Sequence, residues 1–355
     1  MNSNKSICIH ASNVAGLGSI TVVSNILLSF TKNKQFSNSK VFLFLPKIEY
    51  WESIIQKFDS NWEIKLIHRS KYKYLRLIER AFDVLFGHIY LPDVDVLLVL
   101  GDFPLKFKKN QIILFHNVNL ISSNSNFNFY FHKLFFKLNL DYINKCIVQT
   151  DIVKLDMISK FPLLVNKINI LPMPVDEIFE NKISNKVKIA KLDCFYPASF
   201  YAHKNHKVIF DLCNNDENKL INYHFYFTID EQQFFNLKLK NKLSITNLGQ
   251  LTKKDVYDKY LEVDVLIFPS LLESYGIPLI EAMKMNLYII CADLPYAKWL
   301  CENEAEYFDP MDPNSLMKAL DKTFNNKMNN IKPNWHKILS KIPKNWDVYS
   351  LNILN

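Results

Sequence analysis

The chain has 355 residues, about twice the length of a typical domain, so two domains with substantial cores are expected. Its composition, 49% hydrophobic and 22% charged, is that of a soluble globular protein, and no apolar run approaches the ~20 residues of a membrane-spanning helix. The net charge of +8 comes from residues 1–172, which hold 21 Lys and Arg against 12 Asp and Glu, whereas the remainder holds 22 against 23. This split suggests that the first half alone meets a negatively charged partner.

Two other features bear on the compartment. The opening residues, MNSNKSICIHASN, are not a signal peptide, because His10 and Asn13 interrupt the apolar stretch within a few residues. The six cysteines are scattered without a CxxC pair. We therefore expect reduced thiols in the core of a cytosolic protein.

Short apolar runs alternate with helical patterns over the first half, which is typical of a parallel sheet covered on both faces. The predicted strands are Ser6–His10, Val41–Leu45, Val96–Leu100, Ile112–Phe115, Cys146–Gln149 and Lys167–Leu171. The predicted helices are Ser19–Phe30, Leu75–Phe86, Phe129–Leu140 and Ile152–Phe161. The polar, proline-containing stretch that begins at Pro172 is the expected linker.

The same alternation resumes after the linker. Strands are predicted at Cys194–Tyr196, His224–Phe227, Ser244–Asn247, Asp264–Phe268 and Tyr288–Cys291. Helices are predicted at His206–Cys213, Lys253–Leu261, Leu279–Met285 and Ser315–Phe324, and an amphipathic stretch, KNWDVYSLNIL, closes the chain. The expected fold class is α/β, with two consecutive doubly wound domains over residues 1–172 and 173–335.

The stretch FPSLLESYGIPLIEAM, residues 268–283, connects a predicted strand to a predicted helix. Pro278 suits the first turn of a helix, and Gly276 allows close backbone approach or a positive φ. Glu273 falls in the loop and Glu281 in the opening turns of the helix, so both can face the crevice at the carboxyl ends of the strands. Taken singly, Glu281 is explained by favourable placement near the helix dipole and Glu273 by a solvated loop. Together with Gly and Pro in register, they predict a ligand site.

This stretch resembles the donor-site signature of glycosyltransferase family 4 (group 1 type), retaining enzymes of the GT-B fold in which seven residues separate two glutamates. The flanking text, LGQLTKKDVYDKYLEVDVLIFPS and CADLPYAKWL, follows the same family, as do YPASFYAHKNH and LGDFP…ILFHN. The resemblance covers nearly the whole chain. It implies two Rossmann-like domains facing a cleft, with a C-terminal helix at 336–355 that packs back on the first domain.

The resemblance also implies roles for individual residues. Glu281 would hydrogen-bond the ribose of a nucleotide sugar, and Glu273 would touch the transferred sugar. The backbone amides of Tyr275, Gly276 and Ile277 would meet the sugar and diphosphate, and Lys204 would bind the diphosphate. A lysine and helix N-terminal amides can stabilise the departing diphosphate without a metal; no cofactor is expected.

Two features of the first half extend this expectation. In SNVAGLGSI, Gly16 and Gly18 resemble the family's glycine loop, whose amides approach the donor phosphate. An ordinary turn between a strand and a helix explains these two glycines nearly as well. His116 follows a predicted strand, and the resemblance implies that it faces the transferred sugar. On its own, such a histidine is often a hydrogen-bonded loop residue.

The sequence also departs from the family. Many members carry a Gly-Arg pair shortly before the lysine, where this chain has Ala198, Ser199 and Phe200. Asp93 and Asp95 do not form a metal-binding Asp-x-Asp site, because they precede their strand and so lie at its amino end. No His, Cys or Asp cluster has transition-metal spacing.

Two stretches of the first half combine cationic and aromatic residues. KLIHRSKYKYLRLIER, residues 65–80, fits a solvated helix face or a surface that rests on anionic lipid; a nucleic-acid partner is disfavoured by the donor signature. NFNFYFHKLFFKLNL, residues 126–140, fits either an acceptor groove or core.

We therefore expect a cytoplasmic glycosyltransferase, peripherally attached to the inner face of the cytoplasmic membrane. It would move a sugar from a UDP- or GDP-linked donor to a lipid-linked saccharide in lipopolysaccharide, O-antigen or capsule synthesis. The alternatives are a non-catalytic nucleotide-sugar-binding protein and a nucleotide-sugar epimerase of the same fold.

Overall fold

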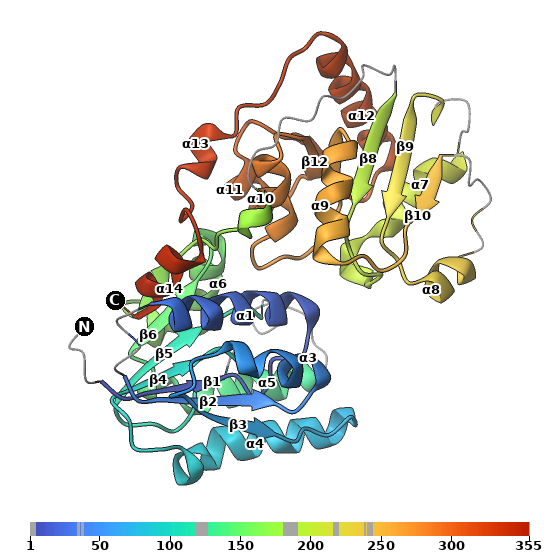
Figure 1. The fold of residues 1–355 in the computed structure, drawn as a ribbon. Helices are drawn as coiled ribbons and strands as arrows, with labels where there is room; N and C mark the ends of the chain where they lie inside the picture. Colours follow the sequence, from blue (N-terminus) through green and yellow to red (C-terminus); the bar gives the residue numbers. More distant parts are fainter. Residues whose placement is uncertain are drawn as a thin grey trace. The chain divides into compact units, whose positions relative to one another are not determined.

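The structure is a computed structural model that describes residues 5–33, 36, 39–101, 103–117, 127–179, 191–215, 220–237, 239 and 244–354. The chain forms two compact units (Figure 1). The first contains residues 1–173 and 343–355, and the second contains residues 174–342.

The first unit is built on a seven-stranded parallel sheet with the order β3-β2-β1-β4-β5-β6-β7. Its strands are β1 (Ile7–His10), β2 (Val41–Pro46), β3 (Glu63–Ile67), β4 (Val96–Val99), β5 (Asn110–Leu114), β6 (Lys145–Val148) and β7 (Ile168–Ile170). Its helices are α1 (Leu17–Lys32), α3 (Glu49–Ile54), α4 (Lys73–Tyr90), α5 (Phe127–Leu138), α6 (Asp151–Lys160) and α14 (Trp346–Leu354). The strand order reverses between β1 and β4, which is where doubly wound folds bind ligands.

The last helix, α14, packs beside α1 on one face of this sheet, while α4 lies on the other face (Figure 1). The Ser29 hydroxyl on α1 donates to the backbone carbonyl of Trp346 at 3.2 Å. Lys145 donates to two carbonyls in the last turn of α14. The chain therefore returns to the first unit, at residue 343.

The predicted boundary at residue 336 lies seven residues too early. Residues 336–342 belong to the second unit, and they are held there by contacts on either side of a short helix, α13 (His336–Leu339). The indole of Trp335 donates to the carbonyl of Leu287 at 2.9 Å. Lys337 and Lys341 both form ion pairs with Glu302.

The second unit has a six-stranded parallel sheet with the order β10-β9-β8-β11-β12-β13. Its strands are β8 (Leu192–Tyr196), β9 (Tyr223–Phe227), β10 (Ile245–Asn247), β11 (Val265–Phe268), β12 (Tyr288–Ala292) and β13 (Glu306–Phe308). Its longer helices are α7 (His206–Asn215), α8 (Glu231–Asn236), α9 (Lys253–Glu262), α10 (Ile277–Lys284), α11 (Pro295–Cys301) and α12 (Pro313–Met328). Here the order reverses between β8 and β11.

The strands that the sequence pattern missed lie at sheet edges. β3 alternates exposed and half-buried residues, so it lacks a continuous apolar run, and β13 has only three residues. All six cysteines are free and buried, as expected for core thiols. No helix among the described residues is long and apolar enough to cross a membrane.

Candidate active site

The turn that follows β11 requires glycine at position 276. Gly276 has φ +93° and ψ +56°, and it precedes α10, with Pro278 in the first turn. A Cβ added at Gly276 would lie 3.0 Å from the Leu279 side chain. The left-handed turn starts the helix abruptly, so that the first amides of α10 lie at the carboxyl edge of the sheet.

Lys204 and Glu273 form an ion pair at this edge, with 2.5 Å between Nζ and Oε1. Their side chains are only 20% and 14% exposed. Lys204 ends a short 3-10 turn, Ala202–Lys204, that follows β8. Because β8 and β11 are neighbouring strands, the loops after them bring the two charges together.

The loop that carries Lys204 is fixed by hydrogen bonds on several sides. The buried hydroxyl of Tyr196 donates to the Lys204 carbonyl at 2.8 Å. Asn205 adopts the left-handed conformation, and its side chain donates to the carbonyl of Pro310 at 2.8 Å. The amide of Leu271 donates to the His203 carbonyl at 2.7 Å, which ties the two loops directly.

Glu281 lies on α10 and faces α9. The Tyr260 hydroxyl donates to its Oε2 at 3.2 Å. Burial raises the pKa of Glu281 to about 7; the Tyr260 hydrogen bond and Lys253 act in the opposite direction, while Asp176 adds to the rise. Lys253 itself forms an ion pair with Asp176. The carboxylate is therefore poised to lose its proton near neutral pH.

Three of these neighbours were not identified from the sequence: Tyr260, Lys253 and Asp176. A capping box between Thr252 and Asp255 starts α9 and places Lys253 in its first turn. Thr-x-x-Asp is visible in the sequence and could have indicated this position. The Tyr260 contact depends on the packing of α9 against α10 and has no comparable signal.

His203, beside Lys204, does not replace the missing arginine of the Gly-Arg pair. Burial, followed by the charge of Lys204, lowers the pKa of His203 below its usual value, so the imidazole is neutral at pH 7. Ala198, Ser199 and Phe200 carry no charge. Lys204 is therefore the only cation among residues 198–204 at neutral pH.

In the first unit, a loop follows β1, Gly16 is the N-cap of α1 and Gly18 lies in the first turn of that helix. Gly16 has φ −82°, and a Cβ added at Gly18 would meet nothing within 4 Å. The backbone conformation therefore does not demand glycine at either position. A Cβ at Gly16 would make only an ordinary contact, 3.4 Å from the Ser19 hydroxyl, and Gly18 is open.

His116 follows β5, two strands from β1, at the same carboxyl edge. Burial lowers its pKa to about 4, so the side chain is a neutral imidazole at pH 7. A neutral imidazole can donate or accept a hydrogen bond but carries no charge to a ligand.

A buried polar network lies at the end of β1, and the sequence did not reveal it. Arg69 pairs with Asp83 and donates to the Ser12 carbonyl, immediately before the glycine stretch. The Tyr90 hydroxyl donates to Asp83 at 2.7 Å and contacts His10. Arg69, one of the cations of residues 65–80, therefore holds the backbone of the loop and is not available to a partner.

The two aspartates rejected as a metal site have structural roles. Asp95 accepts hydrogen bonds from the amide and hydroxyl of Ser6, which lower its pKa, and Asp93 pairs with Lys109 at 2.7 Å. Among the described residues, no group of three or more His, Cys, Asp or Glu side chains is placed to hold a metal ion.

Comparisons with known proteins give concordant results. Residues 179–337 match the family model "Glycosyl transferases group 1". The O-antigen chain mannosyltransferase RfbU of Salmonella typhimurium is 33% identical over 90 residues, 25% of each chain. The serotype-specific mannosyltransferase WbdA of Escherichia coli is 32% identical over 74 residues, 21% of this chain and 9% of the relative. The match thus spans a quarter or less of these curated relatives.

Solved structures match over nearly the whole chain. Anabaena HepE, crystallised with UDP and glucose, superposes with a TM-score of 0.72 at 12% identity, covering 99% of this chain and 98% of that one. WaaG, a glycosyltransferase involved in lipopolysaccharide biosynthesis, gives 0.71 at 13% identity and covers 98% of both chains. These likenesses show the fold, two Rossmann-like units of the GT-B type.

Proposed function

We propose that this chain, which belongs through residues 179–337 to the group 1 glycosyl transferases, transfers a sugar from a nucleotide-sugar donor to a saccharide acceptor. The observation that carries the proposal is the Lys204–Glu273 ion pair beside the glycine turn that starts α10. It combines a cation for a diphosphate, a carboxylate for sugar hydroxyls and helix N-terminal amides at one edge of a sheet.

Donor binding follows from the chemistry of these groups. Lys204 binds the diphosphate and stabilises the negative charge that grows as the sugar departs. The amides around Tyr275, Gly276 and Ile277 face the sugar and phosphates. Glu281, in its ionised form, accepts hydrogen bonds from the ribose hydroxyls, and Glu273 accepts them from the transferred sugar.

The roles that we propose for residues of the first unit come from the family resemblance. The amides at Gly16 and Gly18 approach the donor phosphate, and the neutral imidazole of His116 contacts the transferred sugar. We propose that the reaction retains the anomeric configuration and proceeds by front-face attack within an ion pair. This mechanism needs no carboxylate nucleophile, in contrast to the paired carboxylates of a retaining glycosidase.

The acceptor we propose is a lipid-linked saccharide of lipopolysaccharide or O-antigen assembly, used at the cytoplasmic face of the membrane. The curated relatives support an acceptor of the O-antigen type, since one is named an O-antigen chain mannosyltransferase and the other a serotype-specific mannosyltransferase. They also make a mannosyl donor the first to test.

The test is turnover of a panel of UDP- and GDP-linked sugars by the full chain, with and without a lipid-linked saccharide fraction. Release of nucleoside diphosphate that depends on Lys204 and Glu273 supports the proposal, and NMR of the product's anomeric proton reports retention. Lys254→Ala and Glu262→Gln, at ion-paired positions elsewhere in the same unit, are the matched controls. Donor binding without turnover would identify a non-catalytic binding protein, and an altered sugar without acceptor an epimerase.

A further inference from the structure

The outer face of α4 exposes a continuous apolar stripe. At about 100° per residue, its large side chains fall within an arc of about 120° on the helix. They are Tyr74, Ile78, Phe82, Leu85, Phe86 and Ile89, with exposed fractions from 43% to 80%. Single exposed apolar residues are ordinary, but an aligned row of this length on a soluble unit marks an interaction surface.

The neighbouring helix, α5, extends this surface. Tyr130, Leu134 and Leu138 are exposed at intervals of four residues, so they form a second row on one side of α5. Arg80 of α4 contacts His132 of α5 at 3.1 Å, which places the helices side by side. We call the two rows together the α4–α5 face.

Charged residues around the α4–α5 face are cationic. The two carboxylates of α4 already have partners: half-buried Glu79 accepts from the Ser70 amide, and Asp83 is buried against Arg69. α5 has no acidic residue. Lys71, Arg76 and Lys137, in contrast, are exposed.

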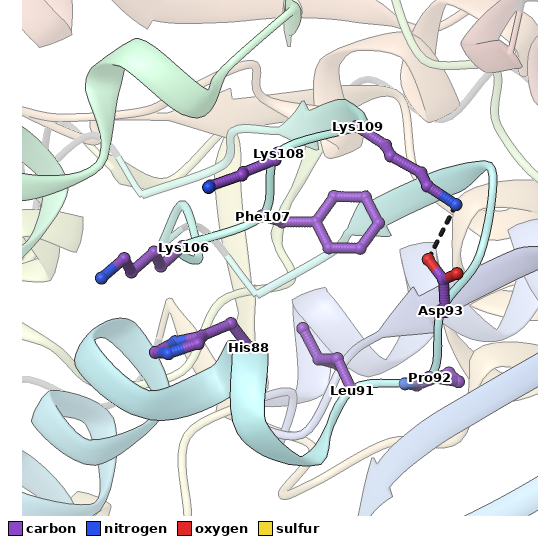
Figure 2. A pocket seen from close by; sticks show the side chains of 8 residues that line it. All are labelled: His88, Leu91, Pro92, Asp93, Lys106, Phe107, Lys108 and Lys109. Carbon is purple, nitrogen blue, oxygen red and sulfur yellow. Dashed lines mark ion pairs between the residues drawn. The ribbon is translucent and has the colours of Figure 1, made fainter.

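A cationic pocket of about 290 Å³ adjoins the end of the α4 row (Figure 2). Leu91, Pro92 and Phe107 form its apolar wall. Figure 2 shows His88, Lys106 and Lys108 on one side of the Phe107 ring and the Lys109–Asp93 pair on the other. None of the ion pairs among the described residues involves Lys106 or Lys108. The carboxyl end of α4 carries about half a negative charge, which disfavours an anion in the pocket. The two ammonium groups of Lys106 and Lys108 outweigh it.

We propose that the α4–α5 face inserts into the interfacial layer of an anionic bilayer, and that the pocket beside it holds the phosphate of a lipid headgroup. Aromatic and aliphatic side chains flanked by lysine and arginine are the composition that interfacial helices present to lipid. A second copy of this chain is a poorer occupant, because a two-fold interface would set the same cations against each other. The inference rests on the proposed function in one respect: a lipid-linked acceptor would explain why the protein attaches to a membrane.

Attachment of this kind differs from attraction by charge alone. Salt weakens the attraction between lysines and anionic lipid, but it does not weaken the burial of apolar side chains. The stripe and the pocket can therefore be separated by their responses to salt and to lipid charge.

The experiment is vesicle co-sedimentation of the full chain at about 0.1 M and 0.5 M salt, with phosphatidylcholine alone or with about a third phosphatidylglycerol. Ile78→Ser combined with Ile89→Ser should lower partitioning at least tenfold on both vesicles and at both salt concentrations. Leu155→Ser with Leu163→Ser is the matched control, since these leucines of the same unit are equally exposed.

Lys106→Gln with Lys108→Gln should lower binding several-fold on the anionic vesicles at low salt and leave the neutral vesicles unchanged. Lys57→Gln with Lys160→Gln, also exposed in the first unit, is the control for this pair.

Three results would overturn the inference: a wild-type chain that ignores vesicles, a stripe variant that binds like its control, or a pocket variant that does. A wild-type dimer that the stripe variant converts to monomer, without vesicle binding, would assign the face to a second copy. Vesicle binding by a chain that turns over no nucleotide sugar would support this inference and contradict the proposed function. Turnover without vesicle binding would contradict this inference and support the proposed function.

Discussion

Affinity for the nucleotide sugar should fall as the pH is lowered from 8 to 6, and Glu281 should cause the fall. Burial against α9 raises the pKa of this carboxyl to about 7. A carboxylate accepts hydrogen bonds from both ribose hydroxyls, whereas a protonated carboxyl has lost part of its acceptor capacity. Donor binding should therefore select the ionised form and release a proton at neutral pH.

The magnitude follows from the two protonation states. With a pKa of about 7, roughly a tenth of Glu281 is ionised at pH 6 and roughly nine tenths at pH 8. If only the ionised form binds the ribose, the affinity should fall about tenfold across this range, equivalent to about 1.4 kcal/mol.

Calorimetry with an intact nucleotide sugar is the appropriate assay. A free nucleoside diphosphate has a terminal phosphate that titrates near pH 6, which would confuse the result. Glu281→Gln should bind weakly and with no pH dependence. Tyr260→Phe removes a hydrogen bond that lowers the pKa of Glu281, so its fall in affinity should begin at higher pH. An equal pH slope in wild type and Glu281→Gln would refute the assignment.

The same shift predicts a pH dependence of stability with the opposite sign from that of an ordinary ion-paired carboxylate. The pKa is about 7 in the folded chain against a model value of 4.5, so between these limits the folded state binds more protons than the unfolded state. The free energy of unfolding should therefore fall by about 3 kcal/mol as the pH rises through this window. Chemical denaturation of Glu281→Gln should lack this contribution.

Four further outcomes are expected. Glu273→Gln should nearly abolish transfer while free nucleotide still binds by calorimetry. Lys204→Ala should lower kcat/KM for the nucleotide sugar without changing the affinity for phosphate-free nucleoside. Because this change leaves Glu273 unpaired in a mostly buried site, it should also lower the free energy of unfolding in urea titration by about 3 kcal/mol. Adding Glu273→Gln should restore part of that loss. Gly276→Ala should lower the free energy of unfolding by about 1–3 kcal/mol, since alanine resists φ +93° and its Cβ crowds Leu279. Turnover should persist in EDTA, because a lysine and backbone amides are assigned to the diphosphate; loss of activity that Mg²⁺ or Mn²⁺ reverses would contradict that assignment.

The interior of both sheets could be predicted from the sequence because central parallel strands are buried on both faces and so read as unbroken apolar runs. VLLV of β4 and VLIF of β11 are examples, and every residue of both is buried. The edge strand β3, with the sequence EIKLI, alternates in exposure and gives no such signal. Residues 65–80 were consequently interpreted as one basic stretch, whereas they form the end of β3, a loop and the start of α4.

The candidate site could be predicted in outline for a related reason. Glu273 and Lys204 follow adjacent strands of a doubly wound sheet, so their loops must meet at one edge. What the sequence could not show was which side chains touch. The Lys204–Glu273 pair, the Tyr260 hydrogen bond to Glu281 and the use of Arg69 inside the first unit all depend on rotamers and on the packing of separate elements.

If the proposed roles of Lys204 and Glu273 hold, their ion pair should set the order of events in donor binding. In the structure each group neutralises the other, so neither charge is left unpaired in a mostly buried position. On the proposed assignment, a diphosphate would offer Lys204 a partner of higher charge, and its arrival would release Glu273 to accept hydrogen bonds from the sugar. A free nucleoside diphosphate would supply only the phosphate half of this exchange, and a free sugar only the other half. On that assignment the pair should favour an intact nucleotide sugar over its fragments, because only the intact donor would satisfy both groups at once.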